Sequence, residues 1–146
     1  MTPTQIDIVR RSHILLLLQQ RAVLRVLRDQ VLQADPGLRP LVVTGDSNLD
    51  HQPVQWLSAV VSLLDKPSLL QKSLQALALR LGRRWGPQHV ARLGQAYLAT
   101  LQTCLSPRWN DETAAAWTAL HDEVLGALRA PLAAARRQAT RDAEVA

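Results

Sequence analysis

A stripe of leucines at helical spacing constrains the fold of this chain more than any other feature. Leu70, Leu74, Leu77 and Leu81 follow one another at steps of four, three and four residues. Such steps place all four side chains on one face of an α-helix. Similar spacing recurs elsewhere in the chain, whereas no hairpin dipeptide joins two alternating segments. We therefore predict an all-α fold.

Helix starts and breaks divide the sequence into segments. Thr2-Pro3-Thr4-Gln5 is typical of a helix start, because threonine caps, proline fits the first position and Gln5 can close a capping box. Asp35-Pro36-Gly37 ends this helical region, and a break near Gln19-Gln20 would divide it in two. Residues 36–50 read as a corner and loop, in which Asn48 or Asp50 can cap the next helix. The later helices are predicted at 51–64, 67–81, 88–105 and from 110 onward.

The domain organisation follows from the length of 146 residues, which fits one domain. We assign residues 1–135 to this domain and residues 136–146 to a charged extension that either continues the last helix or frays. Pro131 is a potential kink in that helix.

Composition excludes several classes of partner. The net charge is +5, but the paired arginines Arg10-Arg11, Arg83-Arg84 and Arg136-Arg137 fall on different predicted segments, so we expect no nucleic-acid partner. The longest apolar run, Ile14 to Leu18, is far shorter than the ~20 residues that span a bilayer. Because no secretory leader is recognisable either, we expect a cytoplasmic protein that binds no membrane.

Catalytic and metal-binding patterns are missing from the sequence. Cys104 is the single cysteine and has no zinc-type spacing to a histidine, so we interpret it as a small core residue. The acidic pairs Asp111-Glu112 and Asp122-Glu123 point in different directions on a helix, which is unsuited to shared acid–base work. We therefore expect that the protein is not an enzyme.

A series of short motifs spans most of the chain: Thr2–Gln5, Asp35–Leu41, His51-Gln52-Pro53, Leu74–Gly86, Gly86–His89 and Ala116-Trp117. Their order and spacing resemble the globin domain of bacterial haemoglobins and flavohaemoglobins. The resemblance implies a globin-like fold of about six to eight helices. A chain of this length is expected to hold no flavin-binding reductase module.

The departures from the family pattern coincide with its haem pocket. The position of the proximal histidine is Leu81, since Leu81 continues the inward stripe and the neighbouring Arg80 does not. Val42 stands at the aromatic position of the corner, and Arg28 stands at the distal tyrosine position on a face shared with Leu32. Gln52 matches the distal glutamine. The resemblance thus implies a pocket at these five positions without the nitrogen donor that haem iron requires.

Four histidines remain as potential ligands. His13 is interpreted as a hydrogen-bonded, partly buried residue, His89 as a cap or surface residue and His121 as structural. His51 and His89 are the candidates for a substitute axial ligand if haem is bound. We expect no cofactor, with haem as the alternative.

Three functions remain open. The first is a haem-free sensor or interaction module that binds a small apolar or anionic ligand, with Arg28 as the candidate contact to an anion. The second is a globin that holds haem through a non-standard ligand and binds oxygen or nitric oxide. The third is a structural or dimerising helical protein, for which Leu79, on an otherwise polar side of its helix, indicates a homodimer or partner surface.

Overall fold

Helices make up most of the chain in the computed structural model, which describes residues 1–42, 52–82 and 85–145. A 3-10 turn, η1 (Pro36–Leu38), and a four-residue helix, α3 (Arg39–Val42), follow the second helix. No strand occurs within the described ranges, and the all-α prediction is confirmed. The six longer helices are α1 (Pro3–Leu17), α2 (Gln20–Ala34), α4 (Gln52–Ser62), α5 (Pro67–Leu81), α6 (Pro87–Leu105) and α7 (Asp111–Val145).

Most of the predicted helix ends agree with the structure, although α4 ends at Ser62 and not at Leu64. The backbone N–H of Gln5 donates to Thr2 Oγ1 at 3.1 Å, and the Thr2 N–H donates to Gln5 Oε1 at 3.0 Å, which completes the capping box. The break near Gln19-Gln20 is real, because α1 and α2 are separate helices. Asn110 Oδ1 accepts from the Thr113 N–H at 2.8 Å and so caps α7. The predicted caps Asn48 and Asp50 lie outside the described residues.

A carboxylate fixes the corner after α2. Asp35 Oδ1 accepts from the Gly37 N–H, and Oδ2 accepts from Arg92 Nη1 of α6, both at 3.0 Å. The hydrogen bond from the Arg92 guanidinium holds the pKa of Asp35 below its ordinary value. This pairing ties the end of α2 to the helix beneath it.

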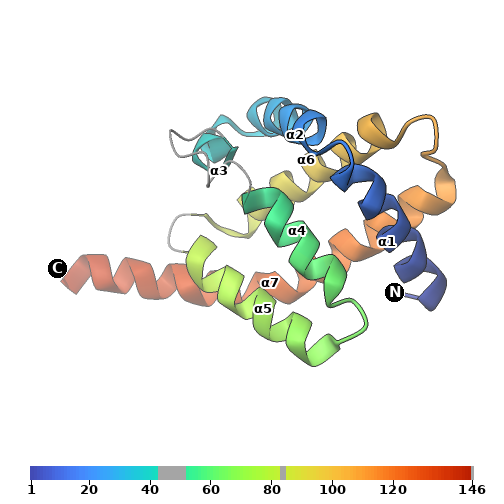
Figure 1. Ribbon diagram of the computed structural model, residues 1–146. Helices are drawn as coiled ribbons and strands as arrows, with labels where there is room; N and C mark the ends of the chain where they lie inside the picture. The colour runs from blue at the N-terminus through green and yellow to red at the C-terminus, as the bar shows by residue number, and fades with distance from the viewer. Residues whose placement is uncertain (43–51, 83–84, 146) are drawn as a thin grey trace.

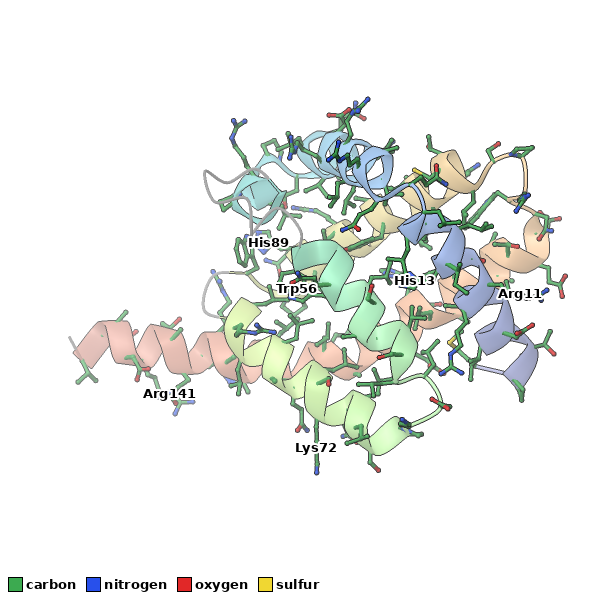
Figure 2. All side chains as sticks on the ribbon, in the orientation of Figure 1. Arg11, His13, Trp56, Lys72, His89 and Arg141 are labelled. Atoms are coloured by element: carbon green, nitrogen blue, oxygen red, sulfur yellow. The ribbon has the colours of Figure 1, made fainter. Side chains whose placement is uncertain are left out.

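The helices cross one another in a layered bundle (Figure 1). α2 packs on α6, while α1 and α5 pack on α7, which runs behind them. The C-terminal part of α7 extends beyond the other helices. The expected boundary between residues 135 and 136 therefore falls inside one continuous helix that contains Pro131. Figure 2 shows Lys72 and Arg141 pointing away from the bundle.

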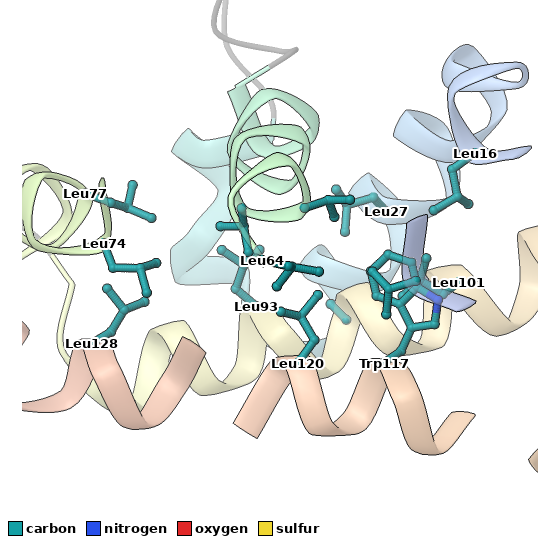
Figure 3. Packing of buried hydrophobic residues seen from close by; sticks show 14 of the residues in the cluster. Leu16, Leu27, Leu64, Leu74, Leu77, Leu93, Leu101, Trp117, Leu120 and Leu128 are labelled. Carbon is teal, nitrogen blue, oxygen red and sulfur yellow. The ribbon is translucent and has the colours of Figure 1, made fainter. Parts of the chain in front are cut away.

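Aliphatic side chains fill the core. Of the predicted stripe, Leu74, Leu77 and Leu81 are buried and Leu70 is partly buried. Figure 3 shows Leu74 facing Leu128 of α7, which is 1% exposed. No helix in the described ranges combines the length and the hydropathy that a membrane crossing requires.

α7 lies close to the end of α5 at Gly82, which follows the leucine stripe. A β-carbon placed on Gly82 would lie 2.5 Å from the Ala135 methyl group and 2.8 Å from the Ala78 carbonyl oxygen. Both distances are shorter than van der Waals contact, so glycine is required there for packing.

Replacing Gly82 by alanine is expected to lower the free energy of unfolding, by roughly 1–3 kcal/mol as overpacked cores do. The matched control is Gly126→Ala in α7, where a β-carbon meets nothing within 4 Å. That variant should gain about 0.5–1 kcal/mol, because alanine is the better helix former. Urea unfolding measures both, and equal effects of the two changes would contradict the close approach of α5 and α7.

Candidate functional site

A cavity of about 120 Å³ lies between α4, α5, α6 and α7. Each of the four helices contributes side chains from its inward face, because the apolar residues of each helix recur at three- and four-residue steps. Representative lining residues are Val60 from α4, Leu81 from α5, Leu93 from α6 and Leu120 from α7. The surface of the cavity is almost entirely hydrocarbon, which suits an apolar occupant.

Few polar side chains reach this cavity. They are Trp56, Tyr97, Trp117 and His121, each of which also presents ring carbon. Burial raises the pKa of the Tyr97 phenol, so the hydroxyl stays protonated across the physiological range. No arginine, lysine, aspartate or glutamate is among the described residues that line the cavity.

Trp117 is the most deeply buried of the polar lining residues. Its side chain is 2% exposed, and its indole nitrogen Nε1 has no hydrogen-bond partner within the described part of the chain. A buried N–H without an acceptor costs about 1–3 kcal/mol. Trp117 lines the cavity, while its Nε1 is sealed from any space that a water molecule could enter.

His121 occupies space that a glycine leaves free. A β-carbon built on Gly94 of α6 would collide with the imidazole ring of His121. Any larger residue at position 94 would push the ring away, so Gly94 lets α6 and α7 approach with the imidazole between them. His121 was interpreted from the sequence as structural, and the structure adds that it lines the cavity.

The five positions predicted for the pocket are only partly brought together. Leu81 lines the cavity as expected. Arg28 and Leu32 are partly buried on α2, which packs on α6, and neither is among the residues that line the cavity. The side chains of Val42 and Gln52 lie outside the described residues.

The remaining histidines have other partners. His13 is 7% exposed, and its Nε2 lies 3.1 Å from Ser58 Oγ. Nδ1 of His89 accepts from the Gly86 N–H at 3.1 Å, so His89 caps α6 as predicted. His51 lies outside the described residues. Figure 2 shows His13 and His89 on opposite sides of Trp56.

The cavity formed by the described residues does not fit haem. Pockets for drug-sized ligands measure ~300–1,000 Å³, and the porphyrin is at the upper end of such ligands. A volume of about 120 Å³ holds only a small fraction of it. Among the described histidines only His121 lines the cavity, and the position after Arg80 offers hydrocarbon where iron would need a nitrogen.

Other chemistry-bearing residues stand apart from the cavity. Cys104 is partly buried, and burial raises the pKa of its thiol, which disfavours the nucleophilic thiolate. Within the described ranges no three His, Cys, Asp or Glu side chains gather as a metal site.

Sequence reasoning missed Trp117 and His121 as cavity residues. A signal was present, because Trp117, His121, Val124 and Leu128 follow at steps of four, three and four on one face of α7.

No family model matches the chain, and no curated protein matches it significantly.

Burial lowers the pKa of His13 below its ordinary value of 6.5. Below pH 6.5 the unfolded chain thus binds a proton at His13 that the folded chain resists, and stability falls as the pH falls. The slope from this residue is at most about 1.4 kcal/mol per pH unit. We predict that His13→Phe weakens the loss of stability between pH 6.5 and 5 in urea unfolding. An unchanged slope in this variant would show that another group is responsible.

Proposed function

We propose that this protein is a haem-free, globin-like helical module that senses or presents a small apolar molecule bound in the cavity between α4, α5, α6 and α7. The cavity itself is the observation that carries this proposal: it is apolar, and Leu81 takes part in its wall. The globin-like assignment draws on the order of the sequence motifs and on the helices that enclose this space.

The energetics of the cavity support an occupant. An unfilled apolar space carries a cost to the fold, because the side chains that line it have no partner atoms on that side. A small apolar ligand recovers part of it by restoring contacts with the lining residues.

The position of the cavity suggests how binding is transmitted. Leu81 lines the cavity at the end of α5, and the next residue, Gly82, packs against Ala135 of α7. A ligand in the cavity would stabilise the packing of α5 on α7. This contact lies next to the projecting part of α7, so a partner protein bound to that part would respond to the altered packing.

Haem held through an unusual ligand is the second candidate. The imidazole that favours it is that of His121, which lines the cavity, whereas His89 is engaged in capping. The small volume of the cavity argues against it. The dimerising alternative draws on Leu79, which is 65% exposed on α5.

The visible absorption spectrum distinguishes the haem-free module from the haem-binding globin. Protein purified from haem-supplied cells should show no Soret absorption, because the cavity is too small for porphyrin and Leu81 provides no ligand. The absorption spectrum of the purified protein is the measurement. A stoichiometric Soret band that disappears in His121→Ala or His89→Ala would contradict the haem-free proposal.

An apolar probe tests occupation of the cavity. Cyclopentane should raise the melting temperature of the wild-type protein, because a ligand that binds only the folded state stabilises it by mass action. In Val60→Phe the added ring atoms take up cavity space, and this shift should be lost. Differential scanning calorimetry with and without cyclopentane gives both values, and equal shifts in the two proteins would place binding outside the cavity.

A further inference from the structure

We propose that a groove beside the projecting part of α7 docks an acidic segment of a partner protein. The groove is lined by Pro87, the first residue of α6, and by side chains between Ala133 and Glu144 of α7. It is called the α7 groove below. None of its lining residues also lines the cavity, so docking here is independent of the cavity ligand.

The α7 groove is large enough for a short stretch of polypeptide. Its volume of about 440 Å³ falls within the ~300–1,000 Å³ of ordinary ligand sites. From Ala133 to Glu144 the helix rises by about 16 Å. Since an extended chain rises by about 3.3 Å per residue, about five residues of a partner cover that length. Pro87 and Ala133, both partly buried, present hydrocarbon to such a segment.

Arginine side chains give the groove its preference for an anion. Arg136, Arg137 and Arg141 all line it, and all three are exposed. Arg137 and Arg141 form no ion pair with any described residue. Figure 2 shows Arg141 pointing away from the bundle, where a partner can reach its guanidinium. Carboxylates suit this group, because a planar guanidinium can donate two parallel hydrogen bonds to one carboxylate.

The spacing of two of these arginines is unfavourable for the helix alone. Arg137 and Arg141 are four residues apart and are therefore neighbours on the surface of α7. Like charges at this spacing destabilise a helix. The adjacent carboxylate, that of Asp142, accepts from Gln138 Nε2 at 2.9 Å and pairs with neither arginine. A carboxylate of a partner bound between Arg137 and Arg141 would relieve their repulsion.

Glu144 favours a protein segment over a partner that carries negative charge alone. It lines the same groove about one helical turn beyond Arg141, and it forms no ion pair with any described residue. A nucleic acid or an anionic lipid surface would bring further negative charge next to this carboxylate, which repels it. A protein segment can place acidic residues opposite the arginines and a basic residue opposite Glu144. This charge order identifies the partner as a peptide segment.

NMR titration with short peptides tests the proposal. The probes are acetyl-Glu-Ala-Glu-Ala-Lys-amide and the peptide of reversed sequence, because the segment can run in either direction along α7. Amide shifts of the full chain give the dissociation constant and the location of binding. The wild type should bind one of the two probes at low salt. Arg137→Gln/Arg141→Gln should bind that probe about fivefold more weakly, because two exposed charge pairs are lost.

Arg21→Gln/Arg25→Gln is the matched control. Arg21 and Arg25 are exposed on α2 at the same four-residue spacing, and neither lines the α7 groove. This variant loses the same total charge, so its dissociation constant should stay within about twofold of the wild type. Equal weakening in the two double variants would show that the probe responds only to the net charge, and the proposal would be overturned.

Reversal of the charges provides a second arm. Arg137→Glu/Arg141→Glu should lose the acidic probe and bind acetyl-Lys-Ala-Lys-Ala-Glu-amide, or its reversed sequence, which the wild type should not bind. If a variant loses helix content by circular dichroism, the wild-type spectrum decides. Its shifted amides should lie between residues 133 and 144, and shifts confined to other helices would overturn the proposal.

The competing partners are tested on the same protein. Phosphatidylserine vesicles and a thymidine oligonucleotide should bind the wild type no better than Arg137→Gln/Arg141→Gln. If either one binds through these arginines while neither peptide binds, a protein partner is excluded. That result would leave the apolar cavity and its ligand untouched, because the cavity is tested separately with cyclopentane.

Discussion

The packing of α5 on α7 holds one wall of the candidate site in place. Leu74 and Leu77 bury one face of α5, and Gly82 lets its end approach Ala135 more closely than any other residue would allow. Leu81 is held on the same face and becomes part of the cavity wall. The geometry of the candidate site is thus set by the residues that stabilise the bundle.

The apolar walls and the open volume of the site both result from incomplete packing of the core. The core is built mainly from leucine, valine and alanine, and it contains no phenylalanine. Aliphatic side chains from four helices leave about 120 Å³ unfilled where aromatic rings could have closed the gap. Trp117 lines that space, and its indole Nε1 has no acceptor in the described part of the protein. Hydrocarbon walls define the proposed ligand as a small apolar molecule.

The sequence predicted local structure better than the site. Caps such as Thr2 and Asn110 depend on neighbouring residues, so their patterns were sufficient. The position of Leu81 followed from its stripe. The position of Arg28 away from the cavity could not be predicted in the same way. Helical spacing shows which residues share a face, but it does not show which helix that face contacts. In the structure α2 packs on α6. Trp117 Nε1 required the tertiary structure, since a missing acceptor can be recognised only once all neighbours are known.

Crystals of the wild-type protein under xenon pressure test the central claim, that an apolar space is open between α4, α5, α6 and α7. Apolar cavities of about 150 Å³ bind xenon. We expect an anomalous difference peak bordered by Leu81, Leu93 and Leu120. Side chains that fill this space with no xenon peak, or iron-porphyrin density in it, would contradict an open, haem-free apolar cavity.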